Sequence, residues 1–220
     1  MIKSLDNMKN GTSPPGSRSC HDNDGFMLSL PAALLDLDMD TADQVARILT
    51  NDTATLTYIR IQNIAVANIV KKRNVTANEK GDGDLQNEYS GIGRVFQVLT
   101  EDAGYNISNP SQNKPSLSDI IKYYGQSCKL PGAFQAGLAA YYLYPDYKSA
   151  VRGNILAGGD SCGRAAFIGA VRAAQDGLDT VPFDWIEMVQ DIEQIIDNAI
   201  SAYSKKEIQS RKGKDLLVNR

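Results

Sequence analysis

Residues 157–177, AGGDSCGRAAFIGAVRAAQDG, decide the class of fold that we expect for this chain. Two glycines interrupt the preceding segment, Asp160 follows them, and the remainder is rich in Ala and Gly. Small side chains recur at intervals of three and four residues: Cys162, Ala166, Gly169 and Ala173. This spacing predicts a helical face that another backbone can approach closely. We therefore expect a central helix in which Cys162 is a small buried side chain.

Helical spacing of apolar residues continues outward in both directions from this stretch, and strand-like alternation is scarce. Ser116, with an acid three residues later at Asp119, resembles a capping box and predicts the start of one helix. The predicted helical segments cover residues 26–35, 45–49, 55–72, 85–101, 116–124, 133–143, 146–157, 161–176 and 183–207, with a polar loop over 74–84 and another through Pro110 and Pro115. The predicted fold class is all-α.

One helical domain over residues 25–208 is the predicted organisation. A chain of 220 residues with 42% hydrophobic content is long enough for one sizeable core. Residues 1–24 are rich in Ser, Gly, Pro, Asn and Asp and predict loop or disorder. Residues 183–207 predict an amphipathic helix that packs on the core, and residues 209–220 a frayed tail.

The charge distribution limits the classes of partner that we expect. Cysteine usage indicates the cellular compartment. The formal net charge is −3 and both signs are spread along the chain, so no basic stripe favours nucleic acid and no polybasic patch favours a membrane. A secretory signal and an apolar run of about 18 residues are absent from the sequence. The three cysteines are far apart and fit reduced thiols. A cytoplasmic protein is expected.

Asp160 and the segment around His21 allow two interpretations each. Asp160 stands where a helix N-cap belongs, and its carboxylate is also a candidate metal ligand. His21 is the single histidine, with Asp22 and Asp24 beside it, which fits a solvated polar loop or a metal or acid–base cluster. Spacing alone leaves both questions open.

Several ordered motifs resemble a known family. The run NILAGGDSCGRA at 154–165, followed by FIGA at 167–170, resembles the C-terminal portion of the ADP-ribosylglycohydrolases, and the J crystallins in particular. Further motifs occur in the family's order: HDNDGFMLSLP at 21–31, SCKLPGAFQA at 127–136 and DYKSAVR at 146–152. The resemblance runs from about His21 to Trp185, and HDNDGFMLSLP resembles the family segment near the ligand cleft.

The resemblance implies an all-helical fold whose active members use two magnesium ions to cut the bond between ADP-ribose and an acceptor. In those members the C-terminal metal motif resembles Gly-Gly-Asp-Thr-Asp-Thr. Asp160 falls on its first Asp and is the implied magnesium ligand, whereas Cys162 falls on the second Asp and Gly163 on the last Thr. A thiol is a soft ligand and glycine has no side chain, so the motif is incomplete. The implied ADP-ribose contacts are Asp22, Asn23, Asp24, Gly25, Ser161 and Cys162.

The family's N-terminal metal motif, of the Thr-Asp-Asp type, has no match in residues 1–20. Two explanations remain open: a fragment that lacks an N-terminal helical portion, which we expect, or a shortened and inactive relative. Two functions follow. The first is a magnesium-dependent hydrolase of ADP-ribosyl glycosidic bonds with an incomplete metal site. The alternative is a catalytically inactive, J-crystallin-like structural or ADP-ribose-binding protein. ADP-ribose or an ADP-ribosylated substrate is the expected partner in the enzyme.

Overall fold

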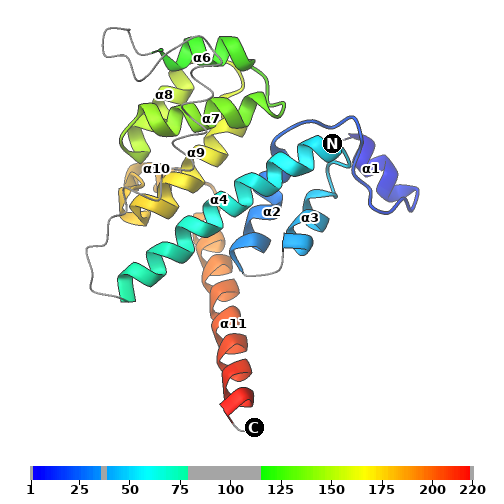
Figure 1. Ribbon diagram of the computed structural model, residues 1–220, viewed down its shortest axis with the longest axis vertical. Helices are drawn as coiled ribbons and strands as arrows, with labels where there is room; N and C mark the ends of the chain where they lie inside the picture. Colours follow the sequence, from blue (N-terminus) through cyan, green and yellow to red (C-terminus); the bar gives the residue numbers. More distant parts are fainter. Residues whose placement is uncertain (1, 36–38, 79–114, 219–220) are drawn as a thin grey trace.

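The computed structural model describes residues 2–35, 39–78 and 115–218, which form helices joined by short connections (Figure 1). The elements are α1 (Ile2–Lys9), α2 (Asp24–Leu34), α3 (Met39–Ala46), α4 (Thr53–Asn78), α6 (Leu117–Tyr124), α7 (Gly132–Leu143), α8 (Tyr147–Leu156), α9 (Ser161–Asp176), the 3-10 helix η1 (Leu178–Thr180), α10 (Phe183–Glu187) and α11 (Ile192–Val218). These ranges contain no β-strand, so the all-α prediction is confirmed. The helix predicted over 85–101 lies outside them.

The helix α9 joins two groups of packed helices, α2–α4 and α6–α8. It contacts α7 and α8 on one side and α4 and α2 on the other. The Phe167 ring of α9 packs edge-on against Phe26 of α2, with centroids 5.8 Å apart, and against Phe134 of α7 at 5.2 Å. One core cluster therefore spans both groups, and the predicted central position of α9 is confirmed.

The buried face of α9 differs from the predicted one. Phe167, Ile168 and Val171 are buried in the core, whereas Cys162 is exposed. The prediction that Cys162 is a small buried side chain is therefore wrong. Large apolar side chains gain more from leaving water than small ones do, so they take the core and the small-residue face lies nearer the surface.

Two buried arginines of α9 lie at the carboxyl ends of neighbouring helices. Arg172 donates from Nη2 to the carbonyl oxygens of Tyr141 and Tyr144, where α7 ends, and its guanidinium lies 4.4 Å from the Tyr141 ring centroid. Arg164 reaches the turn that follows α8. A cation at the carboxyl end of a helix binds carbonyl groups that the helix leaves unpaired.

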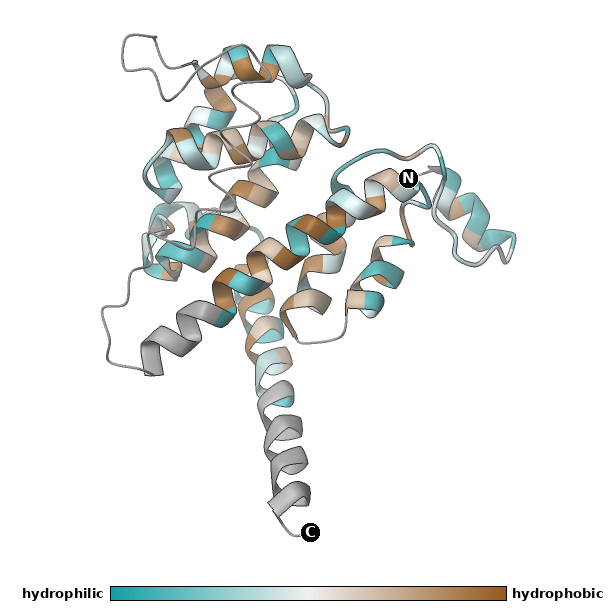
Figure 2. Cartoon of the chain, viewed as in Figure 1, coloured by the Kyte–Doolittle hydropathy of each residue, from teal (hydrophilic) through white to brown (hydrophobic). Residues whose placement is uncertain are grey.

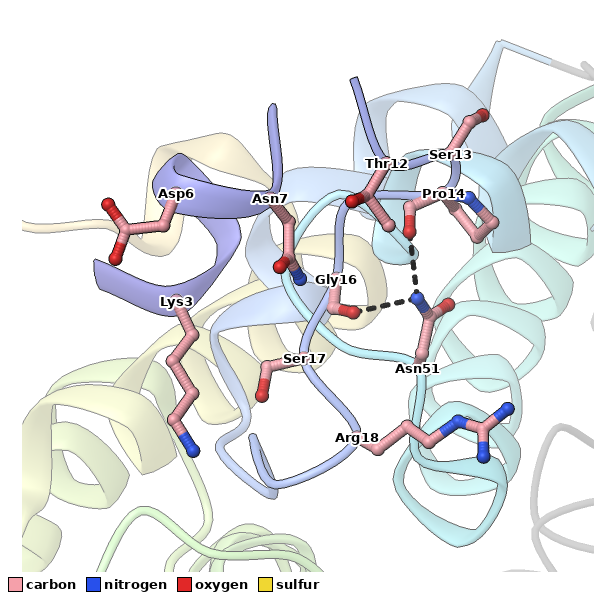
Figure 3. Close-up of a pocket in the computed structure, with 10 residues that line it drawn as sticks. All are labelled: Lys3, Asp6, Asn7, Thr12, Ser13, Pro14, Gly16, Ser17, Arg18 and Asn51. Atoms are coloured by element: carbon pink, nitrogen blue, oxygen red, sulfur yellow. Dashed lines mark hydrogen bonds between the residues drawn. The ribbon is translucent and has the colours of Figure 1, made fainter. Parts of the chain in front are cut away.

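The N-terminal residues are more ordered than their composition suggests. Residues 2–9 form α1, so the loop predicted for residues 1–24 is wrong there. Ser4 is buried and donates from Oγ to the Leu49 carbonyl oxygen at 3.0 Å. Asn51 donates from Nδ2 to the carbonyl oxygens of Pro14 at 3.1 Å and Gly16 at 2.7 Å (Figure 3). These long-range contacts hold the segment, and composition does not report them. A polar cavity of about 500 Å³ lies between α1, this loop and Asn51.

Both long helices extend beyond their predicted ends. α4 continues to Asn78 although a loop was predicted from residue 74, because the first strong helix breaker comes at Gly81. The single helix predicted over 183–207 is interrupted between α10 and α11, where Asp191 has a φ of 57°. α11 continues to Val218, so the tail predicted from residue 209 is helical through that residue.

The described part of α11 does not pack on the core as predicted. The helix leaves the body of the molecule (Figure 1), and hydrophobic residues recur along it (Figure 2). Ile195, Ile196 and Ile200 are 52%, 45% and 59% exposed. Their amphipathic spacing predicted the helix correctly, but spacing does not say which surface covers the apolar face. None of the described helices is long and apolar enough to cross a membrane.

Candidate functional site

Three carboxylates meet where α2 and α9 begin. Asp24 is the first residue of α2, Asp160 immediately precedes α9, and Asp22 lies in the loop before α2. Burial raises the pKa of Asp24, and the charges of Asp22 and Asp160 raise it further. The Asn23 side chain, between Asp22 and Asp24, donates to the Gly163 carbonyl oxygen in the first turn of α9, so the two helix starts lie close together. The structure brings together three of the residues that the sequence singled out.

Cys128 is a neighbour of these carboxylates that the sequence did not identify as a site residue. Its thiol donates to Asp22 Oδ1 at 3.0 Å. Burial raises the pKa of Cys128 to about 12, aided by hydrogen bonds to the carboxylates of Asp22 and Asp160 and by their charges. The thiol therefore stays protonated at neutral pH and acts as a donor. SCKLPGAFQA marked the family, but no spacing in the sequence relates Cys128 to Asp22.

Backbone contacts hold the Asp22 loop against the segment that contains Cys128. The Asn23 N–H donates to the Cys128 carbonyl oxygen at 3.0 Å, and the Leu130 N–H donates to the His21 carbonyl oxygen at 2.8 Å. Between them, Asp22 and Lys129 form an isolated antiparallel bridge. Main-chain pairing thus fixes the backbone of Asp22 against a segment more than a hundred residues away, and the Cys128 thiol contacts its carboxylate.

Asn23 stabilises the fold and does not line the surface of the site. It is fully buried, its Nδ2 donates to the Gly163 carbonyl oxygen at 3.1 Å, and its Oδ1 accepts from Gln62 Nε2 at 2.8 Å. Both ends of its amide are bonded within the protein. This placement does not support the predicted contact between Asn23 and a ligand.

The remaining predicted ligand residues differ in their exposure. Gly25 is buried, and a Cβ at this position would meet Ile59 Cδ1 at 2.6 Å, so glycine lets α2 approach α4. Ser161 is half-buried, and its carbonyl oxygen accepts from Asn154 Nδ2 at 2.8 Å. Cys162 is exposed at the start of α9. Ser161 and Cys162 retain surface that a ligand can reach, whereas Gly25 acts through packing.

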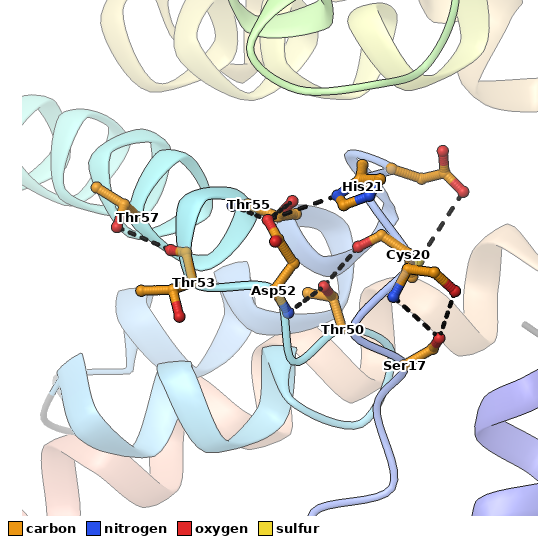
Figure 4. A network of polar contacts seen from close by, with 10 residues as sticks. Ser17, Cys20, His21, Thr50, Asp52, Thr53, Thr55 and Thr57 are labelled. Carbon is orange, nitrogen blue, oxygen red and sulfur yellow. Dashed lines mark hydrogen bonds and ion pairs between the residues drawn. The ribbon is translucent and has the colours of Figure 1, made fainter.

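His21 pairs with Asp52 (Figure 4). His21 Nδ1 lies 3.5 Å from Asp52 Oδ1. That oxygen also accepts from the Thr55 N–H at 2.8 Å and from Thr55 Oγ1 at 2.7 Å, and these hydrogen bonds hold the pKa of Asp52 below its usual value. Asp52 therefore caps the first turn of α4. The placement favours a structural contact for His21 over a metal or acid–base cluster.

The turn formed by Gly158 and Gly159 places Asp160 at the site. Gly158 and Gly159 have φ angles of 79° and 70°, a backbone region that glycine adopts without strain. A Cβ on Gly159 would lie 2.6 Å from the Gln126 carbonyl oxygen, which accepts from the Asp160 N–H at 2.7 Å. Asp160 occupies the N-cap position of α9, but its carboxylate makes no capping hydrogen bond. The carboxylate instead interacts with the Cys128 thiol.

The described residues do not by themselves form the magnesium centre that the resemblance implied. In the ranges 2–35, 39–78 and 115–218, no three His, Cys, Asp or Glu side chains are arranged to hold a metal ion. Asp160 has the right chemistry for magnesium, but Cys162 offers an exposed thiol and Gly163 offers no side chain.

A sequence model described as ADP-ribosylglycohydrolase matches residues 1–210. The chain belongs to the ADP-ribosylglycohydrolase family. The match extends beyond residues 21–185, where the motifs had placed the resemblance, and it includes α1. The family acts on ADP-ribosylated substrates.

The similarity to J crystallins is also confirmed. Crystallin J1A of Tripedalia cystophora is 41% identical over 87 residues, which cover 36% of this chain and 27% of the relative. Crystallin J1B of the same organism is 35% identical over 81 residues, which cover 37% of this chain and 25% of the relative. The aligned part of this family member thus spans about a quarter of the length of these curated relatives.

Proposed function

We propose that this chain binds the ADP-ribosyl group at the cluster of Asp22, Asp24 and Asp160 without hydrolysing its glycosidic bond. The observation that carries the proposal is the meeting of these three carboxylates at the starts of α2 and α9. Family membership supplies the ligand class. The departure from the family's metal motif at Cys162 and Gly163 and the similarity to J crystallins support binding without hydrolysis.

The site offers carboxylates and backbone N–H groups, and ADP-ribose offers ribose hydroxyls and a pyrophosphate. Carboxylates accept hydrogen bonds from ribose hydroxyls. The first turns of α2 and α9 receive no side-chain capping bond. The Phe26 and Ser161 N–H groups donate to the carbonyl oxygens of Asn23 and Gly159, and the other first-turn N–H groups lie at the positive helix ends, which favour a pyrophosphate. The helix ends thereby offset the repulsion between the acidic cluster and an anionic ligand.

Magnesium-dependent hydrolysis of an ADP-ribosyl bond is the second candidate function. The raised pKa of Asp24, to which Asp22 and Asp160 contribute, favours it because a divalent cation relieves repulsion between carboxylates. Magnesium-dependent hydrolysis requires oxygen ligands, and the side chains at positions 162 and 163 supply none. For this reason we place it second.

Calorimetric titration with ADP-ribose tests the first proposal. We expect binding by the full chain and a Kd about 10- to 100-fold weaker in Asp160→Asn, from the usual contribution of a hydrogen bond to a charged group. Asp179→Asn is the matched control because it removes one negative charge from an exposed residue of η1. An unchanged Kd in Asp160→Asn contradicts the proposal. Two-ion magnesium binding together with magnesium-dependent release of ADP-ribose from a modified protein favours hydrolysis instead.

A further inference from the structure

Arg164 is a fully buried cation beside the glycine turn that carries Asp160. It is the largest of the fully buried side chains. Its Nε donates to Asn154 Oδ1 at 2.7 Å, and its Nη2 donates to the Gly158 carbonyl oxygen. Among the residues that the structure describes, its Nη1 finds no hydrogen-bond partner.

Arg164 and Asn154 together hold the chain on both sides of Asp160. Asn154 is fully buried and donates from Nδ2 to the Ser161 carbonyl oxygen at 2.8 Å. The guanidinium therefore fixes Gly158 directly and fixes Ser161 through the amide of Asn154. Glycines at positive φ permit the turn but do not favour it over other conformations. Arg164 adds a restraint to the one that the Asp160 N–H provides by donating to the Gln126 carbonyl oxygen.

The energetics of Arg164 point away from a purely stabilising role. A buried guanidinium with an unpaired N–H carries a desolvation penalty that an apolar side chain of similar volume does not. Arg172, on the same helix, has Asp176 as an ion-pair partner at 3.5 Å. For Arg164 no such partner occurs in the described ranges. Burial lowers its pKa, and the nearby charge of Asp160 opposes this effect.

We propose that Arg164 is a positioning residue that holds the Asp160 turn, so that the Asp160 carboxylate stays beside Asp22 and Asp24 when ADP-ribose binds. The inference rests on the proposed binding function. It adds a residue that does not touch the ligand and that acts through the backbone of Gly158 and Ser161. Its effect on binding is separable from its effect on folding because exchange of the Asp160 amide and ADP-ribose binding are both measured on the folded chain.

Matched lysine variants test the positioning role. Arg164→Lys keeps the charge but cannot bond to Asn154 and Gly158 together, and Arg172→Lys makes the same change at a buried arginine distant from the turn. Two quantities are measured on the full chain below its unfolding temperature: the Kd for ADP-ribose, and the hydrogen-exchange rate of the Asp160 amide relative to amides of α4. Asn154→Ala is a second variant in case Arg164→Lys does not fold.

We expect Arg164→Lys to weaken ADP-ribose binding about 10-fold and to accelerate exchange of the Asp160 amide about 10-fold. Arg172→Lys should change both quantities less than twofold. Unchanged Asp160 exchange in Arg164→Lys and Asn154→Ala, or equal acceleration in Arg172→Lys, overturns the positioning role. If the unaltered chain does not bind ADP-ribose, the proposed function fails, and the exchange measurement still decides whether Arg164 holds the turn.

Discussion

The side-chain amide of Asn23 donates a 3.1 Å hydrogen bond to the carbonyl oxygen of Gly163, and this contact joins the starts of α2 and α9 across 140 positions of sequence. Gln62 of α4 donates to the other end of the same amide. Three helices therefore meet at one buried side chain. The arrangement of Asp22, Asp24 and Asp160 depends on this junction, although none of the three carboxylates takes part in it.

Asn23→Ala should destabilise the protein by about 1–3 kcal/mol, because it removes the donor to the buried Gly163 carbonyl oxygen and leaves Gln62 Nε2 with its 3.3 Å bond to the Tyr58 carbonyl oxygen. The free energy of unfolding from urea titration measures this change. Asn198→Ala, at an exposed position of α11, is the matched control and should change it by less than about 0.5 kcal/mol. Equal values for the two variants contradict the role assigned to Asn23.

The cysteines should differ sharply in their reactivity. Burial and hydrogen bonds to carboxylates raise the pKa of Cys128 to about 12, so its thiolate, the reactive form, is scarce at pH 8. Cys162 is exposed. Mass spectrometry after brief iodoacetamide treatment of the folded protein should find Cys162 modified first. Asp22→Asn removes a negative charge that raises the Cys128 pKa and should speed its alkylation. Equal rates at Cys128 and Cys162 in the unaltered chain would sink this prediction.

The raised pKa of Asp24 predicts a specific pH dependence of stability. Burial is its main cause, and the charges of Asp22 and Asp160 add to it. The folded state then binds the proton more tightly than the unfolded state, so the Asp24 contribution to stability falls as pH rises from about 3.8 through the raised folded pKa. Asp24→Asn should remove this fall, as measured by urea unfolding between pH 3.5 and 7.

Asp160→Asn serves as an internal check on the Asp24 titration. Removing the Asp160 charge should lower the pKa of Asp24 toward its ordinary value, which carbon NMR of the side-chain carboxyl measures directly. Asp184→Asn, on an exposed residue of α10, should leave the titration of Asp24 unchanged. A pKa of Asp24 that is the same in both variants would show that Asp160 does not lie close to it.

The sequence predicted the helices because these depend on local information. Apolar spacing placed α6–α9 within one or two residues, and Ser116 caps α6 as predicted, with its Oγ accepting from the Asp119 N–H. The resemblance also supplied Asp22 and Asp24, which the structure brings to Asp160. The helix positions, the Ser116 cap and the family motifs can each be recognised from a short stretch of sequence.

The parts that the sequence did not predict depend on contacts between distant residues. Cys128 meets Asp22 only through the pairing of two loops, and Gln62 meets Asn23 only after α4 packs on α2. Periodicity placed Cys162 on a helix but could not show which face of α9 would be buried. Composition likewise described residues 1–24 as loop and missed the contacts that hold α1.

Arg172 gives the clearest expected effect on stability outside the candidate site. Its guanidinium binds the carbonyl oxygens of Tyr141 and Tyr144 and lies 3.5 Å from Asp176. Arg172→Met keeps most of the apolar volume but leaves the carbonyls without their donor and Asp176 without its cation. We expect a loss of about 3–5 kcal/mol in the free energy of unfolding, as for other broken buried pairs. Arg152→Met, at an exposed position of α8, should change it by less than about 0.5 kcal/mol. If the two variants unfold at the same urea concentration, the capping of α7 by Arg172 contributes nothing to stability.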